Sequence, residues 1–310
     1  MDCCIPQWDS KTLQSQDTPS GQYRVNPSDV ERVELSGEFL MGTEDIDCVT
    51  GDGEGPIRKV VLSPFAMATT TVTNEEFARF VDATRYQTDA EAFGWSFVFN
   101  QFISRKTAKT IRQVVTQTPW WWQVPEASWK QPEGPDSNVD DRPDHPVVHI
   151  SWNDAQAYCN WSGTRLPTEA EWEFAARGGR IQNRYPWGNN LTPNGQHQCN
   201  IWQGSFPSKN TLDDGYAGTA PAKSYEPNEY GIYNTSGNVW EWCTDWSSKI
   251  PKPVECKLDP GGPPEGTSKV TKGGSYLCHA SYCNRYRISA RSSATPDSST
   301  GNMGFRTVSL

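Results

Sequence analysis

The 310-residue sequence lacks any long apolar run, and no segment approaches the roughly 18 apolar residues that a membrane-spanning helix needs. Its first residues, MDCCIPQWDSKTLQSQ, also lack the apolar stretch of a secretory signal peptide. Long basic runs are missing too, and the net charge of −9 argues against binding to nucleic-acid phosphates. We therefore expect a cytoplasmic monomer without a membrane or nucleic-acid partner.

The sequence is also poor in hydrophobic residues, which make up only 35% of it, but 14 Trp, 11 Tyr and 11 Phe are among them. Each buried aromatic side chain removes about 150–250 Å² from water, so these residues can build a core despite the low total. The 25 Gly and 23 Pro interrupt the chain often, which disfavours long helices. The composition predicts an aromatic core, short regular elements and long loops.

A disulfide framework is absent as well, because the nine cysteines are scattered through a long chain without the spacing of a disulfide scaffold. They stand at positions 3, 4, 48, 159, 199, 243, 256, 278 and 283. A reducing compartment is the simpler interpretation of this scatter.

One segment, KGGSYLCHASYCNRYRISAR at residues 272–291, combines paired cysteines with aromatic and basic side chains. Its cysteines are Cys278 and Cys283, and its arginines are Arg285, Arg287 and Arg291. Fixed positive charge near a cysteine favours the reactive thiolate. Soft thiolates select Cu(I) or Zn(II), but a structural zinc ion needs four ligands and only two cysteines are local. From the spacing alone, buried thiols, a disulfide and a metal site all remain possible.

Local signals predict several short elements. Capping boxes, in which an N-cap hydroxyl pairs with a carboxylate three residues later, predict helices after Thr73, Ser151 and Thr168. Apolar patterns predict strands over residues 33–35, 38–42, 59–62 and 145–150, whereas the aromatic segment 86–140 is predicted to be irregular. Residues 1–30 are polar and without periodicity, so we expect a mobile lead-in followed by one domain, residues 31–310.

Short motifs spread over nearly the whole chain resemble the formylglycine-generating enzyme family, also called the sulfatase-modifying factor family. They are Gly37–Gly42 (GEFLMG), Arg165–Glu173 (RLPTEAEWE), Tyr185–Asn189 (YPWGN), Gly237–Trp242 (GNVWEW), Gly273–Ser275 (GGS) and Gly304–Arg306 (GFR). The resemblance implies a single-domain α+β fold of the C-type-lectin-like kind, with little regular secondary structure. These motifs occur throughout the wider fold family, but residues 277–287, LCHASYCNRYR, are similar to the signature of its catalytic, copper-dependent branch.

The resemblance implies an oxidoreductase that converts the cysteine of a Cys-x-Pro-x-Arg motif in an unfolded sulfatase to Cα-formylglycine, using O2 and an external thiol reductant. Cu(I) would be bound linearly by Cys278 and Cys283, and the substrate sulfur would complete the site. Ser275 would be a catalytic hydrogen-bond donor, and Cys283 the more accessible sulfur. The positions that match the family's substrate pocket are Trp240, Tyr282, Arg285 and Asn302.

The resemblance also implies two structural Ca²⁺ sites. The first would use Asn200, Ile201, Asp214 and Tyr216, and the second Asn234, Thr235, Gly237 and Val239. Apolar members of these sets would contribute backbone carbonyl oxygens, which are hard ligands of the kind that Ca²⁺ prefers.

Two departures from the family pattern concern disulfides. Vertebrate members resemble an extracytoplasmic enzyme with disulfides that span the fold. Cys159 stands at one half of such a bridge, but Thr307 holds the position of its partner, and Ile288 replaces another bridge cysteine. Both departures favour a bacterial-type cytoplasmic enzyme.

Other interpretations remain open. The chain could be a non-catalytic lectin-like or sulfatase-binding paralogue, or a metal-free thiol oxidoreductase whose cysteine pair cycles through a disulfide. His145 and His149 have the spacing of iron-binding histidines in related sulfoxide synthases, but Ser151 stands where those enzymes need an acidic residue. The cluster Trp120–Trp122 is interpreted as packing rather than as a binding platform.

Overall fold

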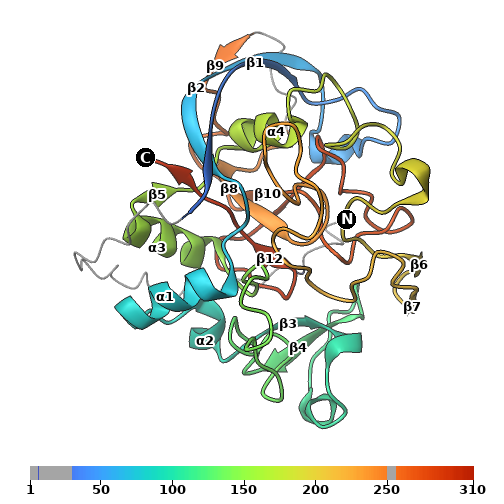
Figure 1. The fold of residues 1–310 in the computed structure, drawn as a ribbon. Coiled ribbons are helices and arrows are strands. Elements are labelled where there is room, and N and C mark those ends of the chain that lie inside the picture. Colours follow the sequence, from blue (N-terminus) through green and yellow to red (C-terminus); the bar gives the residue numbers. More distant parts are fainter. Residues whose placement is uncertain (1–5, 7–29, 250–255) are drawn as a thin grey trace.

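The computed structural model describes Pro6 and residues 30–249 and 256–310. The predicted lead-in, residues 1–30, therefore lies outside the described residues except for Pro6 and Val30. In the described part, short helices and strands are joined by long loops, which confirms the predicted single-domain α+β fold with little regular structure (Figure 1). None of the helices in these ranges is long and apolar enough to cross a membrane.

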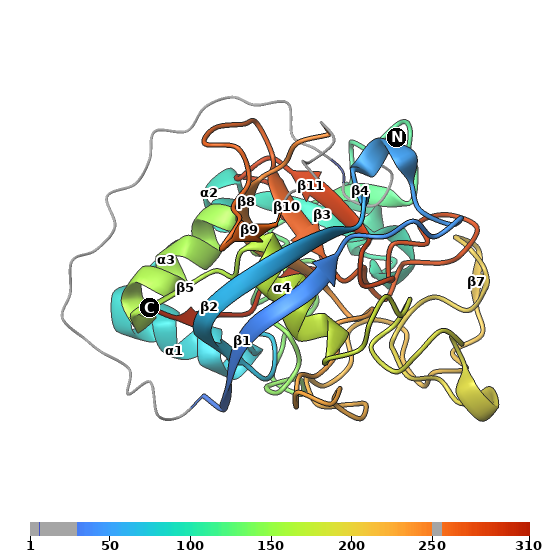
Figure 2. The same ribbon diagram turned by 90° about the horizontal axis from the view of Figure 1, so that it is seen from above.

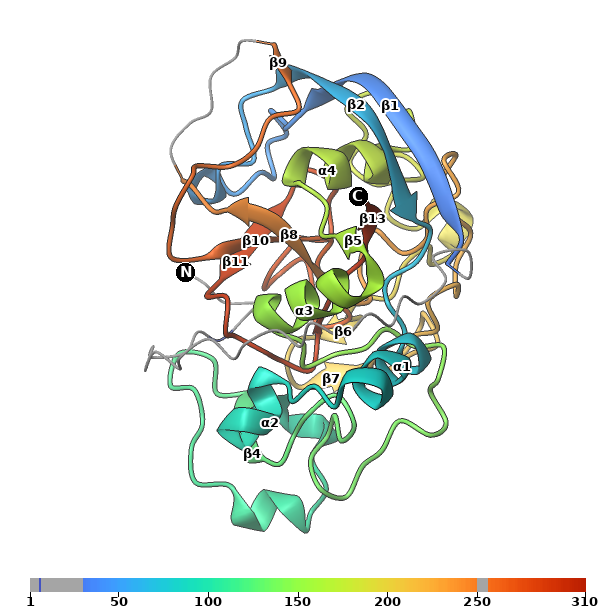
Figure 3. The ribbon, with the colours of Figure 1, turned by 90° about the vertical axis from the view of Figure 1, so that its left-hand side faces the viewer.

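Two sheets lie on either side of helix α4 (Glu169–Arg177), which contacts strands of both (Figures 1 and 3). The first sheet contains β1 (Arg32–Met41), β2 (Arg58–Ala68), β5 (Thr164–Arg165), β9 (Lys257–Leu258) and β13 (Val308–Ser309). Its order is β1-β2-β13-β5, with β9 beside β2. The second sheet contains β8 (Trp240–Trp246), β10 (Lys269–Lys272), β11 (Arg291–Ala294) and β12 (Met303–Gly304), in the order β11-β10-β8-β12.

Helix α4 lies beneath the antiparallel pair β1–β2 (Figure 2), and every one of its residues is buried. It begins at the predicted capping box of Thr168 and ends where Gly178 takes the left-handed conformation, with φ 54°. Buried carboxylates need partners. The acids of the helix meet this need in ion pairs: Glu169 with Arg291 at 2.7 Å, Glu171 with Arg165 at 2.6 Å and Glu173 with Arg177 at 2.7 Å.

The other two predicted helices are confirmed as α1 (Asn74–Thr84) and α3 (Trp152–Ser162), each with its capping box formed. Phe77 and Phe80 of α1 pack on Tyr158 of α3, with ring centroids 6.0 and 5.6 Å apart. The amphipathic spacing seen in the sequence therefore faces the core.

The prediction that residues 86–140 are irregular is wrong. This segment contains α2 (Asp89–Phe93), β3 (Trp95–Phe99), β4 (Trp121–Pro125) and the 3₁₀ turns η3 (Asn100–Phe102) and η4 (Thr107–Thr110). Helix α2 has a capping box of its own, Thr88 with Glu91. Strands β3 and β4 pair antiparallel across a long intervening loop, and local patterns do not show such a pairing.

The predicted strand at residues 145–150 is also absent as a strand. Pro146 forms only an isolated bridge with Thr73, and His149 has φ 58°, a left-handed conformation that ends an extended segment. The remaining short elements are η2 (Thr50–Asp52), η5 (Pro193–Gly195), β6 (Gly204–Ser205) and β7 (Lys209–Asn210).

His149 is fully buried, and both of its ring nitrogens have protein partners. Nδ1 lies 2.8 Å from Ser96 Oγ, and Nε2 lies 2.8 Å from the carbonyl oxygen of Pro132. These contacts occupy the two atoms that could bind iron, which agrees with the rejection of a histidine metal site. His145 is instead bonded through Nδ1 to Thr219 Oγ1, at 2.9 Å.

Burial lowers the pKa of His149 to about 4, from an ordinary value near 6.5. The unfolded chain therefore takes up a proton below pH ~6.5 that the folded chain refuses until pH ~4, so stability falls as pH drops through this window. We expect His149→Gln to remove up to about 3 kcal/mol of this pH dependence. Urea unfolding of both proteins between these pH values measures it, and identical slopes would contradict the assignment.

Candidate active site at Cys278 and Cys283

Strand β10 leads directly into the cysteine segment through two glycines. Gly273 and Gly274 have φ of 91° and 73°, which side chains rarely adopt. A Cβ on Gly274 would also lie 2.9 Å from Tyr286 Cα. The glycine pair therefore allows the chain to turn into a buried loop that brings Ser275 and Cys278 together.

The two cysteines of this loop face each other, with 2.8 Å between Cys278 Sγ and Cys283 Sγ. A tight turn holds them there, because the amides of Tyr282 and Cys283 both donate to the carbonyl of His279, at 3.0 and 2.9 Å. Both side chains are buried, with 1% and 3% of their surface exposed. Burial thus does not single out Cys283 as the accessible sulfur.

The three arginines of the segment are all paired with carboxylates. Arg285 Nε lies 2.5 Å from Asp52, Arg287 Nη1 lies 2.6 Å from Glu54, and Arg291 Nε lies 2.7 Å from Glu169. Their charges are therefore largely compensated, which corrects the expectation that they act mainly by favouring the thiolates. They tie the cysteine loop to residues 50–54 and to α4.

A small cavity of about 180 Å³ lies beside Cys278. Ordinary ligand pockets measure about 300–1,000 Å³, so this cavity can take one side chain but not a folded ligand. Its lining residues are Trp120, Trp121, Ser275, Leu277, Cys278, Tyr282 and Asn302.

Of the residues predicted for the site, Ser275, Tyr282 and Asn302 line this cavity with Cys278. Cys283 lies behind Cys278, and the Trp240 side chain belongs to the hydrophobic core, where its Nε1 bonds to no described group. The backbone of Trp240 still contributes, since its amide donates to the carbonyl of Asn302 at 2.8 Å. Arg285 is outside the lining and, besides Asp52, bonds the Cys283 carbonyl at 3.4 Å.

Ser275 is oriented by its neighbours. Asn302 Nδ2 donates to Ser275 Oγ at 2.9 Å, and Leu277 N donates to it at 3.4 Å. The amide of Asn302 is itself fixed by Thr300 Oγ1, which donates to Asn302 Oδ1 at 2.6 Å. Because Ser275 Oγ accepts both bonds, its own proton is available to a group in the cavity.

Aromatic rings form one wall of the cavity. Tyr282 stacks on Phe206 with ring centroids 4.2 Å apart, and Trp120 meets Tyr282 edge to face at 4.9 Å. Trp121 is buried against Phe99 at 6.4 Å. The tryptophan cluster is therefore packing, as predicted, but it also lines the site, and Phe206 carried no signal in the sequence.

The residues predicted for calcium binding lie together. The carboxylate of Asp214 accepts bonds from the amides of Ile201 at 3.0 Å and Tyr216 at 3.1 Å, and the amide of Asn238 donates to the carbonyl of Asn200 at 2.8 Å. The last contact joins the first predicted set to the second, which lies within residues 234–239.

Three buried oxygens of these sets have no hydrogen-bond partner among the described residues: Asn200 Oδ1, Asn234 Oδ1 and Thr235 Oγ1. Unsatisfied buried oxygens are costly, and hard cations satisfy them. No group of three or more His, Cys, Asp or Glu residues suited to a metal occurs in the described part of the chain. The donors thus fit a cation held mainly by amide and carbonyl oxygens, with Asp214 as the charged ligand.

The positions of the missing disulfides are filled by other contacts. Cys159 is a buried free thiol, and burial raises its pKa to about 12. Thr307 instead accepts a bond from Arg32 Nη2 at 3.1 Å, and Ile288 is packed in a core cluster.

Comparisons with known proteins place these features in context. Residues 16–309 match the family described as "Sulfatase-modifying factor enzyme 1-like domain". A formylglycine-generating enzyme of Thermomonospora curvata is 59% identical over 273 residues, covering 87% of this chain and 90% of its own. The formylglycine-generating enzyme of Bos taurus is 55% identical over 272 residues, covering 87% and 72%.

More distant relatives are informative too. "Inactive C-alpha-formylglycine-generating enzyme 2" of Mus musculus is 45% identical over 276 residues, covering 88% of this chain and 83% of its own. The structure of PvdO from Pseudomonas aeruginosa superimposes with a TM-score of 0.61 at 23% identity, covering 89% and 93%, which shows a shared fold.

Proposed function

The chain belongs to the sulfatase-modifying factor family of formylglycine-generating enzymes, and we propose that it oxidises the cysteine of a Cys-x-Pro-x-Arg segment in an unfolded sulfatase to Cα-formylglycine. The observation that carries this proposal is the sulfur pair Cys278 and Cys283 beside a cavity for a single side chain. Because the family also contains inactive relatives at 45% identity, overall similarity alone does not carry it.

We propose Cu(I) as the cofactor, held by Cys278 and Cys283. The donor set fits, because two adjacent soft sulfurs suit Cu(I), whereas structural zinc needs four ligands. Bound copper would supply the redox chemistry with O2, and an external thiol would supply the additional electrons. The substrate loses its sulfur and two hydrogens from its carbon and side chain, and gains the aldehyde oxygen.

The protein's own residues have positioning roles in this proposal. The proton of Ser275 Oγ points toward oxygen or the substrate sulfur, and Asn302 keeps the hydroxyl in that orientation. The stacked rings of Tyr282, Phe206 and Trp120 exclude water from one side of the cavity. Arg285 holds the loop through Asp52 and the Cys283 carbonyl rather than through a printed contact with the cavity.

Replacing Ser275 by alanine is expected to lower turnover roughly ten- to hundredfold, the effect of losing one hydrogen bond to a charged or charging group. The matched control is Ser281→Ala, because Ser281 is an exposed serine of the same loop that contacts only His279 among printed side chains. Steady-state rates of aldehyde formation measure the effect. Equal rates for the two variants would remove Ser275 from the mechanism.

We also propose that Ca²⁺ stabilises the fold at the Asn200 and Asn234 sets. Calcium at about 100 times its dissociation constant should then add about 2.7 kcal/mol to the free energy of unfolding. Asp214→Asn should weaken this gain, whereas Asp213→Asn, which changes a neighbouring exposed carboxylate, should leave it intact. Unfolding in calcium and in chelator measures the gain, and a gain unaffected by Asp214→Asn would contradict the site.

A cytoplasmic location is proposed as well, supported by the buried free thiol of Cys159 where a bridge would need a partner. The enzymatic proposal is tested by incubating the copper-loaded protein with a Cys-x-Pro-x-Arg peptide, O2 and a thiol reductant. Mass spectrometry should show conversion of the cysteine to an aldehyde, and a peptide with serine in its place should be unchanged. A folded, copper-loaded protein that leaves the cysteine peptide intact would refute the proposal.

A further inference from the structure

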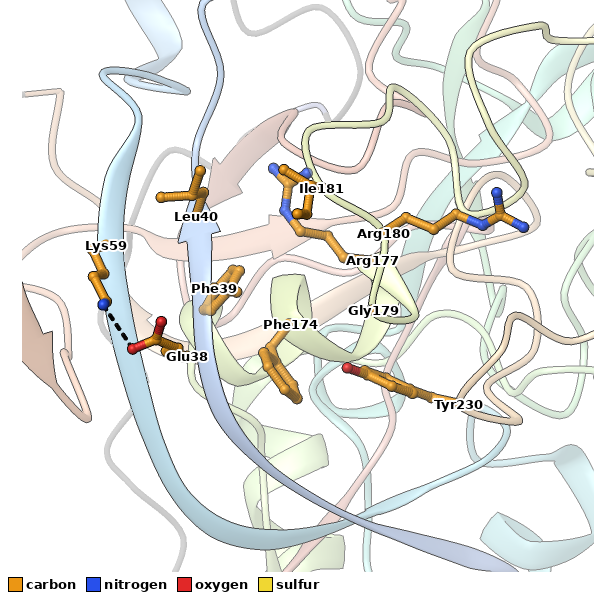
Figure 4. A pocket seen from close by; sticks show the side chains of 10 residues that line it. All are labelled: Glu38, Phe39, Leu40, Lys59, Phe174, Arg177, Gly179, Arg180, Ile181 and Tyr230. Atoms are coloured by element: carbon orange, nitrogen blue, oxygen red, sulfur yellow. Dashed lines mark ion pairs between the residues drawn. The ribbon is translucent and has the colours of Figure 1, made fainter.

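A second cavity, of about 350 Å³, opens between strand β1 and the C-terminal end of α4 (Figure 4). Its volume falls within the about 300–1,000 Å³ of small-molecule sites. It shares no lining residue with the cavity at Cys278. Nothing in the proposed oxidation uses it.

The inner end of this cavity is cationic. Arg177 has only 3% of its surface exposed, and its Nη2 donates to Glu173 Oε1 at 2.7 Å and to the carbonyl of Gly42 at 2.9 Å. Its Nη1, in contrast, is buried without a hydrogen-bond partner among the described residues. An unsatisfied buried guanidinium nitrogen is costly, so an acceptor from outside the chain would stabilise it.

The charges around Arg177 do not balance within their hydrogen-bonded cluster. Glu173 is shared with Lys272, whose Nζ lies 3.2 Å from the second carboxylate oxygen. Two buried cations therefore share one carboxylate. The other cations that line the cavity have partners of their own, Lys59 with Glu38 and Arg180 with Glu229, both at 2.7 Å. The excess positive charge is thus at the Arg177 end, where it favours an anion.

The walls of the cavity are aromatic. Phe39 meets Phe174 edge to face at 5.3 Å, and Tyr230 lies on the other side of Phe174 at 5.5 Å. The rim carries Leu40 and Ile181, which are unusually exposed for aliphatic side chains, at 40% and 77%. An apolar, ring-shaped body would cover this surface.

We propose that this pocket binds a small aromatic carboxylate, with its ring against Phe39, Phe174 and Tyr230 and its carboxylate on Nη1 of Arg177. Figure 4 shows the guanidinium of Arg177 beside the side chain of Ile181. Because Nη1 is enclosed and Ile181 is exposed, Ile181 turns outward to admit the carboxylate. The binding is independent of the oxidation chemistry.

Titration of the full chain with phenylacetate, followed by NMR, tests the proposal against phenylacetamide, its neutral isostere. Phenylacetate should bind saturably, and phenylacetamide should bind at least roughly tenfold more weakly, because a carboxylate bonds a guanidinium more strongly than an amide does. The affected resonances should belong to residues of β1 and the end of α4.

Matched variants at the rim provide the control. Ile181→Glu places a negative charge beside the bound carboxylate and should weaken phenylacetate binding roughly fivefold relative to Ile181→Gln. Arg177→Gln should abolish binding, but because it can disturb folding the Ile181 pair is decisive. Equal affinity for the acid and the amide, absence of saturable binding, or equal affinity of the two Ile181 variants would each overturn the proposal.

Discussion

Replacing Cys278 or Cys283 by serine is expected to lower the rate of formylglycine formation by more than about a hundredfold, the upper range for losing a mere supporting partner of a metal site. The sulfurs lie 2.8 Å apart, and each serine variant leaves a single soft ligand. Copper affinity should fall in parallel, which direct metal analysis of the purified variants measures.

Cys256→Ser is the matched control, because Cys256 is an exposed free thiol on the opposite side of the mechanism's requirements. It should keep both turnover and bound copper. If Cys278→Ser or Cys283→Ser also kept full copper-dependent turnover while folded, the pair would not be the catalytic centre.

Replacing Glu173 by glutamine is expected to give the largest loss of stability, about 3–5 kcal/mol, because it leaves Arg177 and Lys272 buried without their carboxylate. Burial opposes ionisation of Glu173, but the nearby charges of Lys272 and Arg177 hold its pKa at about 2. The stabilisation is therefore present above pH ~4.5, the unfolded pKa, and is lost as pH falls toward ~2.

Urea unfolding at neutral pH and in mild acid measures both effects. Glu229→Gln is the control, because it removes the carboxylate of an exposed ion pair with Arg180 and should cost less than about 1 kcal/mol. A Glu173→Gln protein as stable as this control would show that the buried cluster does not depend on its carboxylate.

The helices could be predicted because their signals are local. The boxes at Thr73, Ser151 and Thr168 each lie within one helical turn, and all three formed. The β3–β4 pair and the bonds from Arg285 to Asp52 and from Arg287 to Glu54 could not be predicted in this way. Their partners are far apart in sequence and meet only when the chain has folded.

The candidate site shows the same division. Ser275 and Asn302 were proposed from the resemblance, and the structure joins them by a 2.9 Å hydrogen bond beside Cys278. Phe206 and Trp120 reach the site through aromatic packing with Tyr282, and no spacing in the sequence encodes that packing. The arginines looked like activators of the thiols, because a sequence shows charges without showing their partners.

The central claim, that Cys278 and Cys283 hold the copper that supports cysteine oxidation, is tested most directly by one titration. The rate of aldehyde formation on a Cys-x-Pro-x-Arg peptide is measured as metal-depleted protein is loaded with increasing amounts of Cu(I) under O2 and a thiol reductant. We predict a rate that is negligible without copper and rises in proportion to bound copper until the site is filled. An undiminished rate in the metal-depleted protein would contradict the account and favour a metal-free thiol oxidoreductase.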